Sequence, residues 1–488
     1  MNTFDFDDDQ SGGSRPERKN LEEEVRRLRE ALRRGENKHG IVPDVETLEE
    51  LIEYCLDKDK LEDALSFANL WVEFAPYSGD AWQKKGMVLH NMLRFEEALA
   101  AYDSALTLNP ADMETSVHRC VTMANAGDSE GAMRELEKLL TIEPSNEDAL
   151  YTKAVILEQF GEYRKAVKIF TYLAQTERFG PDAWYELGVC YENLGMLDQA
   201  VAAYDAFLDD DPFSDNGWFN RGAILSRKGR YYEAIENYDM ALAINAGLPP
   251  AWFNRGIAFM ALGRMNEALA SFKEALALEP DDGTIWYNMG SAYEELGRYR
   301  EAIKCYSRAT KLQPDNSEAY FGRGSCYDAL ELYRQALEDY NQALSIDDES
   351  SDIWYAKADV LYNIRHLNEA LECYQKVLEL DGADFECWYD YGETLIDLER
   401  FDDAGQAFTR VCELAPEWAE GYFALARIAA KRRRHSDTMR YLVQSIKCDD
   451  SKLIDFQREF PHFFSGENER LLREALGDAR INPDNSTV

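Results

Sequence analysis

Seven of the nine tryptophans in this chain fall on one arithmetic series with a step of 34 residues. The series runs through twelve consecutive units, from about Val45 to Asp450, without an inserted or deleted residue. A fixed period of this length indicates an array of stacked supersecondary units, which overrides the expectation of about two to four domains from length alone. The tryptophans of the series are Trp82, Trp184, Trp218, Trp252, Trp286, Trp354 and Trp388.

Each unit can be numbered so that the tryptophan series is position 4. Position 20 is then alanine in eleven of the twelve units, position 8 is usually glycine or alanine, position 24 is usually tyrosine or phenylalanine, and position 32 is often proline. Within a unit, apolar residues recur every three or four residues over two stretches, separated by a glycine such as Gly297. This pattern predicts two antiparallel helices per unit, with position 4 wedged over the small residues.

These residues resemble the tetratricopeptide repeat, whose pattern is W-x-x-L-G-x-x-Y, A-x-x-x-F and P. The clearest unit matches it at Trp286, Gly290 and Tyr293, then at Ala302 and Tyr306, and ends on Pro314. The chain is thus similar to bacterial-type multi-repeat members of this family. It departs from the pattern at position 7, which is often Lys or Arg, and we expect those stems to lie on apolar surface with their charges in water.

The resemblance implies an all-α fold, a right-handed solenoid of twelve helix-turn-helix units whose first helices line a concave groove. It also implies recognition of other proteins. We expect residues 45–450 to form the twelve units, residues 451–480 to form capping helices and residues 481–488 to be a tail. Residues 1–44 are expected to comprise an acidic disordered N-terminus, a charged amphipathic helix over about 20–34 and a linker.

The predicted N-terminal helix allows two interpretations. Leu21, Val25, Leu28 and Leu32 form a narrow apolar stripe. It can cap the apolar face of the first unit, or it can mediate self-association in the manner of a coiled-coil seam.

The net charge limits the partners. The formal charge of −39 repels phosphate backbones and anionic membrane surfaces, so it argues against nucleic-acid binding and favours neutral or basic protein partners. No stretch is apolar enough to span a membrane or to form a signal peptide, and we expect a cytoplasmic protein without membrane insertion.

Chemistry-bearing motifs are missing from the sequence. The nine cysteines show no metal-ligand spacing, which indicates a reducing compartment, and the histidines stand alone. No phosphate-binding loop, nucleophile elbow or zinc-protease motif occurs. We therefore predict that the chain is not an enzyme and holds no metal or cofactor.

The predicted groove would be formed by first-helix residues that packing does not require. Position 5 is aromatic in nine consecutive units, and aromatic surface with hydroxyl groups suits peptide binding, although the same rings can pack against a neighbouring helix. These residues are Tyr151, Tyr185, Phe219, Phe253, Tyr287, Phe321, Tyr355, Tyr389 and Phe423.

Two polar rows accompany the aromatic positions. Glu158, Glu192, Glu294 and Asp328 at position 12 predict a negative lining for Lys or Arg of a partner, or are simply solvated acids. Asn220, Asn254 and Asn288 at position 6 predict an asparagine ladder that binds peptide main chain, or are solvated amides.

We therefore expect a non-enzymatic scaffold or adaptor that binds a neutral-to-basic peptide or domain in the concave groove. The alternative is a self-assembling spacer, or an assembly factor that positions a partner enzyme, with self-association through residues 20–34.

Overall fold

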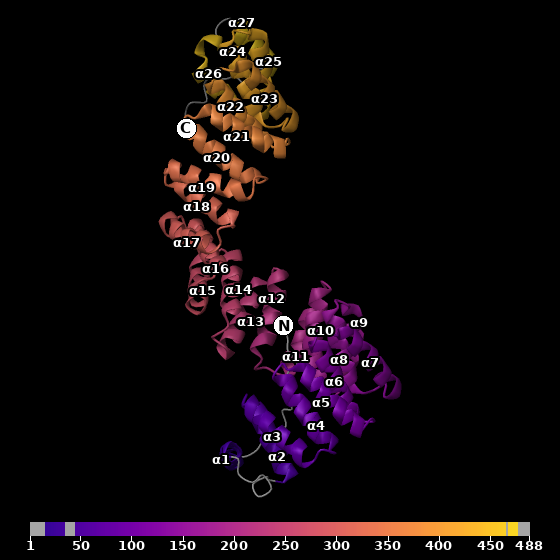
Figure 1. The fold of residues 1–488 in the computed structure, drawn as a ribbon. Helices are drawn as coiled ribbons and strands as arrows, with labels where there is room; N and C mark the ends of the chain where they lie inside the picture. Colours follow the sequence, from indigo (N-terminus) through magenta and orange to yellow (C-terminus); the bar gives the residue numbers. More distant parts are fainter. Residues whose placement is uncertain (1–14, 35–43, 465–466, 477–488) are drawn as a thin grey trace. The chain divides into compact units, whose positions relative to one another are not determined.

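The computed structural model describes residues 15–34, 44–464 and 467–476, and every regular element in these ranges is a helix (Figure 1). The predicted disordered N-terminus, linker and tail fall largely outside the described residues. The chain divides into two compact units, residues 1–246 and 247–488, which are called here the N-terminal body and the C-terminal body.

The N-terminal body contains the terminal helix α1 and six helix pairs. Its helices are α1 (Arg15–Arg33), α2 (Val45–Asp57), α3 (Leu61–Phe74), α4 (Gly79–Asn91), α5 (Phe95–Leu108), α6 (Met113–Asn125), α7 (Ser129–Ile142), α8 (Glu147–Gln159), α9 (Tyr163–Leu173), α10 (Gly180–Asn193), α11 (Leu197–Asp210), α12 (Asp215–Arg227) and α13 (Tyr231–Ile244).

The C-terminal body contains six further pairs and a short helical end. Its helices are α14 (Pro249–Ala261), α15 (Met265–Leu278), α16 (Gly283–Glu295), α17 (Tyr299–Leu312), α18 (Ser317–Ala329), α19 (Tyr333–Ile346), α20 (Ser351–Asn363), α21 (Leu367–Leu380), α22 (Phe385–Asp397), α23 (Phe401–Leu414), α24 (Ala419–Lys431), α25 (His435–Cys448), α26 (Lys452–Glu459), the 3₁₀ turn η2 (Pro461–Phe464) and α27 (Glu467–Leu476).

The helix starts keep the 34-residue register. The first helix of a unit begins at position 1 in eleven of the twelve units, with α10 one residue early, and the second helix begins at position 17 in all twelve. Side chains just before the first helices explain this regularity: Ser78, Asp112, Asn146 and Ser214, for example, each accept a hydrogen bond from a backbone N–H of the first turn. Such N-caps satisfy donors that the helix itself leaves unpaired.

The turn between the two helices of a unit has one conformation throughout. Position 15 has a positive φ in all twelve units; six of these residues are glycines and six are not. The non-glycine members include Leu93, Glu331 and Glu399, with φ of 58°, 60° and 59°. Because a side chain is strained in the left-handed region, the backbone geometry is imposed there by the packing of the two helices.

The small residue at position 8 makes room for the aromatic ring at position 24 of the same unit. A Cβ added at Gly256 would lie 2.4 Å from Phe272 Cε1, and one added at Gly188 would lie 2.6 Å from Tyr204 Cζ. Both rings are completely buried. The prediction that position 4 wedges over these small residues is therefore wrong, because the position-24 ring occupies that place.

The position-4 tryptophans instead fasten each unit to the turn before it. The indole N–H of Trp82 donates to the carbonyl of Pro76 at 3.1 Å, and Trp218, Trp286, Trp354 and Trp388 repeat this bond six residues back, at 2.9–3.1 Å. Each of these rings is half-buried. Tryptophan suits such a position because it buries apolar surface and still needs a partner for its N–H.

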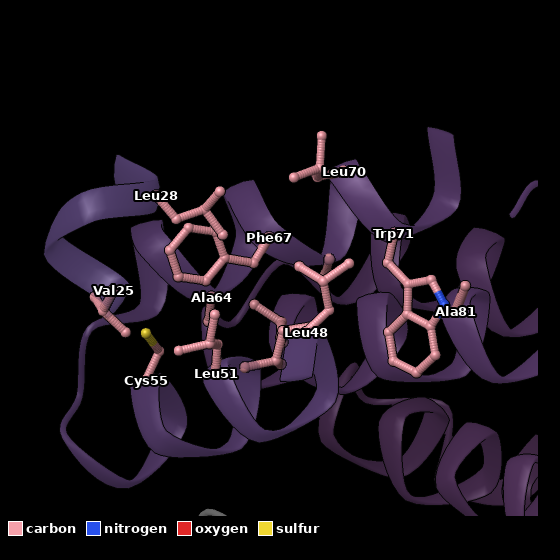
Figure 2. Close-up of a cluster of buried hydrophobic side chains, with 13 residues drawn as sticks. Val25, Leu28, Leu48, Leu51, Cys55, Ala64, Phe67, Leu70, Trp71 and Ala81 are labelled. Atoms are coloured by element: carbon pink, nitrogen blue, oxygen red, sulfur yellow. The ribbon is translucent and has the colours of Figure 1, made fainter. Parts of the chain in front are cut away.

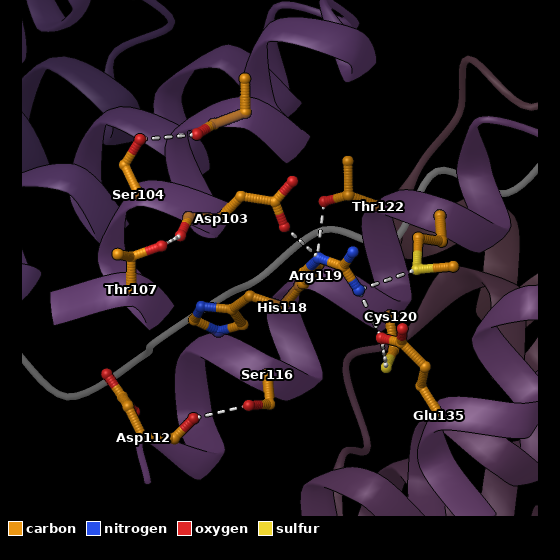
Figure 3. Close-up of polar contacts among 12 residues, drawn as sticks. Asp103, Ser104, Thr107, Asp112, Ser116, His118, Arg119, Cys120, Thr122 and Glu135 are labelled. Atoms are coloured by element: carbon orange, nitrogen blue, oxygen red, sulfur yellow. Dashed lines mark hydrogen bonds and ion pairs between the residues drawn. The ribbon is translucent and has the colours of Figure 1, made fainter. Parts of the chain in front are cut away.

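Position 7 holds arginines that join neighbouring second helices. Arg119 of α6 pairs with Asp103 of α5 and with Glu135 of α7 (Figure 3). In the C-terminal body, Arg323 of α18 makes two hydrogen bonds to Asp339 of α19, at 2.7 and 2.6 Å, and donates to Ser307 of α17 at 3.2 Å. The Arg323 and Asp339 side chains are only 18% and 9% exposed. The expectation that these charges lie in water is therefore wrong: they are paired, and they bridge consecutive units.

Helix α1 covers the outer face of the first pair. Val25 and Leu28 are buried against residues of α2 and α3 that include Leu51, Cys55 and Phe67 (Figure 2). The Arg29 Nε of α1 also donates to Asp63 of α3 at 2.7 Å. The apolar stripe of the N-terminal helix is thus used within its own chain. At the other end of the C-terminal body, Phe456 of α26 and Phe463 of η2 are buried against α24 and α25.

Candidate functional site

The aromatic residues at position 5 lie on the first helices and pack inward. All are half-buried except Phe423, which is buried. From Tyr151 to Tyr389, each ring contacts the position-24 ring of its own unit, with centroids 5.4–6.0 Å apart. These contacts account for the position-5 rings by packing, so a ligand is not needed to explain their presence.

The tyrosine hydroxyls at position 5 reach the next unit. The Tyr151 hydroxyl donates to Glu186 at 3.4 Å, the Tyr355 hydroxyl donates to Asp390, and the Tyr185 hydroxyl accepts from Asn220 Nδ2 at 2.9 Å. In each case the partner is at position 6 of the following first helix. Position 5 and the next position 6 therefore form a polar seam along the first helices of each body.

The three asparagines of the predicted ladder have different surroundings. Asn220, on α12 of the N-terminal body, uses its amide N–H on Tyr185. Asn288, on α16 of the C-terminal body, donates to the Thr284 carbonyl of its own helix at 2.8 Å. Asn254 lies half-buried on α14. Two of the three amides thus already donate within the chain, and the peptide ladder stays a prediction.

The four predicted groove acids are half-buried, and three of them contact other side chains of the chain. Glu192 is neutralised by Arg227, with Nη1 and Oε1 2.8 Å apart. Glu294 accepts a hydrogen bond from the Tyr306 hydroxyl at 2.7 Å. Glu158 is hydrogen-bonded to Glu186, and burial raises the pKa of Asp328.

The C-terminal body carries a row of acids on successive first helices, α18, α20 and α22. This acidic row consists of Asp328, Asp359 and Asp390. Burial, and secondarily the charges of Asp390 and Asp328, raise the pKa of Asp359 to about 6, although a 2.6 Å hydrogen bond from the Tyr374 hydroxyl opposes the shift. Burial also raises the pKa of Asp390. Among the described residues, no Lys, Arg or His forms an ion pair with any of the three.

The N-terminal body carries a closer pair of acids, Glu158 of α8 and Glu186 of α10. Burial, followed by the charge and hydrogen bond of Glu158, raises the pKa of Glu186 to about 8, and burial raises the pKa of Glu158 as well. Two carboxyl groups this close cannot both be ionised without a large cost, so the pair retains a proton at neutral pH.

Sequence reasoning missed Glu186, Asp359 and Asp390. Each column of the repeat was inspected at one position, whereas the acids approach one another along a diagonal: position 12 in Asp328, position 9 in Asp359 and position 6 in Asp390. The signal was present in the sequence, because positions 5, 9 and 12 share one helix face and position 6 borders it.

Other kinds of site find no support in the part of the chain that the structure describes. No group of three or more His, Cys, Asp or Glu side chains there is arranged to hold a metal ion. None of the described helices combines the length and the apolar character needed to cross a bilayer. All nine cysteines are free thiols, and seven of them are buried.

Comparison with known families decides the classification. The family described as "Cilia and flagella-associated protein 70 C-terminal domain" matches residues 143–386, which is half of the chain. Two descriptions named "Tetratricopeptide repeat" match residues 355–418 and 79–112. The chain belongs to the tetratricopeptide repeat family. Tetratricopeptide repeat proteins are in general scaffolds for protein interaction and are typically not enzymes.

Solved structures of tetratricopeptide repeat proteins are similar to parts of this chain. They include YrrB, titled a protein with an unusual peptide-binding site (21% identity, 38% of this chain and 97% of that one, TM-score 0.35). MamA from Desulfovibrio magneticus has 23% identity over 34% of this chain and 94% of its own, with a TM-score of 0.33. The C-terminal part of a repeat protein from Cytophaga hutchinsonii has 18% identity over 49% and 97%, with a TM-score of 0.44. No curated protein matches the chain.

Proposed function

We propose that this tetratricopeptide repeat protein is a non-enzymatic cytoplasmic scaffold that binds a basic segment of a partner protein along its first helices. The observation that carries the proposal is the acidic row Asp328, Asp359 and Asp390 of the C-terminal body. These carboxyl groups are drawn out of water and close enough to raise the pKa of Asp359 to about 6. The chain supplies no ion-pairing cation for them among the described residues.

A cation from outside would relieve this arrangement. Half-buried carboxylates that lose water without gaining a positive partner are held at a cost, and a Lys or Arg side chain placed among them recovers part of it. The overall charge of −39 adds long-range attraction, which speeds encounter with a basic partner. The acidic row then determines where such a partner docks.

Self-association through residues 20–34 has less support than partner binding. Val25 and Leu28 of α1 are 1% and 4% exposed and lie against α2 and α3 of the same chain. A seam between two copies would have to displace them.

The proposal is tested by binding of a fluorescein-labelled peptide of alternating Lys and Gly to the full chain, followed by anisotropy. We expect Asp359→Asn combined with Asp390→Asn to weaken binding by about tenfold, in line with about 1.4 kcal/mol for the loss of two close charges. The control removes two acids from exposed second-helix positions, Glu274→Gln with Glu372→Gln. Equal weakening by both pairs would show that only net charge matters and would refute the proposed docking surface.

A further inference from the structure

The pair formed by Glu158 and Glu186 in the N-terminal body is a different feature from the acidic row. Both side chains are half-buried, so the pair is open to solvent on one side. The Tyr151 hydroxyl contacts Glu186 at 3.4 Å. No salt bridge of the described residues involves either acid, although the nearby acids Asp148 and Glu192 each have one.

The local fold turns the neighbouring cations away from the pair. The unit that contains α8 and α9 departs from the common geometry, because α9 ends at Leu173 and α10 begins one residue early, at Gly180. Within this altered turn, Arg178 pairs with Asp148 at 2.8 Å, and Phe179 stacks on Tyr151 with ring centroids 5.0 Å apart. Arg227 on α12 is likewise occupied by Glu192.

A buried hydroxyl beside the pair has no partner. Tyr204 of α11 is completely buried, and its hydroxyl makes no hydrogen bond to any described residue. Its ring lies under Gly188, and the charges of Tyr185, Glu192 and Glu186 add to burial in raising the pKa of the Tyr204 phenol. An unpaired buried hydroxyl costs about 1–3 kcal/mol, so its position beside two unneutralised carboxyl groups indicates a missing ligand group.

We propose that Glu158, Glu186 and the Tyr204 hydroxyl form a subsite for one arginine side chain of a partner protein. This inference rests on the proposed function only in that the arginine is carried by a protein that the scaffold binds. The guanidinium presents five N–H donors in a planar fork, and the subsite offers two carboxyl groups and a hydroxyl that lie in different directions. A lysine ammonium, with a single centre of charge, uses fewer of these acceptors at once.

Arginine binding at this subsite is coupled to release of a proton. The empty pair holds a proton near neutral pH, and a guanidinium placed against it favours the fully ionised pair, so the proton of Glu186 leaves to solvent. The titratable groups that face Glu186 are Glu158 and Tyr151 of α8, Asp182, Tyr185, Cys190 and Glu192 of α10, and Tyr204 of α11. None of them is a cation that would replace the lost proton. The affinity of the subsite therefore rises with pH.

The experiment uses the full chain and three labelled peptides of one sequence, which carry arginine, lysine or citrulline at one central position. We expect the arginine peptide to bind about tenfold more tightly at pH 8 than at pH 7, the limit for release of one proton, and more tightly than either analogue. Glu186→Gln should weaken arginine binding at pH 8 by about tenfold and remove the pH dependence. Tyr204→Phe, which keeps the ring under Gly188, should weaken it by a smaller factor.

Matched controls separate the possible outcomes. Glu236→Gln with Asp209→Asn removes two exposed charges from second helices of the same body and should leave the preference for arginine over citrulline unchanged. Equal binding of the arginine and citrulline peptides by the wild type, or an unchanged pH dependence in Glu186→Gln, would overturn the subsite. If Glu186→Gln fails to fold, the wild-type comparison of peptides and the Tyr204→Phe variant decide alone. Binding that depends only on Asp359 and Asp390 would uphold the proposed function and refute this inference, whereas absence of binding by any basic peptide would refute both.

Discussion

A glycine-to-alanine change at position 8 tests how the helices of one unit are held together. In Gly256→Ala the new Cβ would lie 2.4, 2.7 and 2.9 Å from three carbons of the Phe272 ring. Carbon atoms in contact prefer about 3.5–4.0 Å, so the ring or helix α14 must move by roughly 1 Å. The ring cannot rotate away because it is completely buried between the two helices.

The expected magnitude follows from two opposing effects. Alanine is better than glycine inside a helix by about 1 kcal/mol, and overpacking a full core costs about 1–3 kcal/mol. Because three ring atoms are too close at once, we expect the upper end of that cost and a net loss of about 1–2 kcal/mol in the free energy of unfolding. Gly405→Ala in helix α23 of the same body is the matched control, since a Cβ there meets no atom within 4 Å. It should stabilise by about 0.5–1 kcal/mol.

Urea unfolding of the full chain, with hydrogen exchange to locate the change, measures both variants. In a nearest-neighbour stack the loss from Gly256→Ala should appear first in α14 and α15 and in the pairs beside them. The reasoning is refuted if Gly256→Ala is as stable as Gly405→Ala, because the position-24 ring would then not be the fixed partner of position 8.

Three further predictions follow from other parts of the structure. Glu331→Gly, at a position-15 residue with φ of 60°, should raise the free energy of unfolding by about 1 kcal/mol in urea titrations, and no change would mean that the turn is relaxed. Asp339→Asn should lower it by about 2–3 kcal/mol, since Arg323 then stays half-buried without its charge partner, whereas Arg323→Met with Asp339→Leu should cost much less. Burial, with the Glu158 charge, raises the pKa of Glu186 from 4.5 to about 8. The wild type should therefore lose local stability in α8 and α10 as pH rises from about 4.5 to about 8, by about 2–3 kcal/mol after allowance for coupling to Glu158. Hydrogen-exchange protection factors should show this loss in the wild type and not in Glu186→Gln. Glu233→Gln, which removes a carboxyl whose pKa Arg230 lowers by hydrogen bonding, should show the opposite sign, with wild-type stability lost as pH falls.

Local patterns predicted the repeat well because each unit obeys the same backbone rules. N-capping residues such as Ser78 and Asn146, the alanine at position 20 and the two helical stretches fix where each helix starts, and these signals lie within a few residues of their effect. Contacts between units were harder to predict. The role of position 4 was misassigned because both its ring and the position-24 ring are large, and the sequence does not say which one lies over the glycine.

The charged contacts could not be read from single columns. Arg323 resembles a surface residue in the sequence, yet its partners are 16 residues away in both directions, on α17 and α19. The acids Asp328, Asp359 and Asp390 occupy three different positions of three units, so only the stacking of those units brings them together. Electrostatic sites of this kind depend on the offset between neighbouring units, which the repeat pattern leaves open.

The burial of α1 has a consequence for how copies of this chain behave in concentrated solution. An uncovered first pair would offer the same apolar face that each internal pair offers its neighbour, and head-to-tail polymerisation would follow. With Val25 and Leu28 seated on α2 and α3, that face is occupied within the chain, and Arg29 holds the helix to Asp63. Fibre growth at this end would first require exchange of α1 between copies, so that polymerisation there would be limited by the rate at which α1 opens.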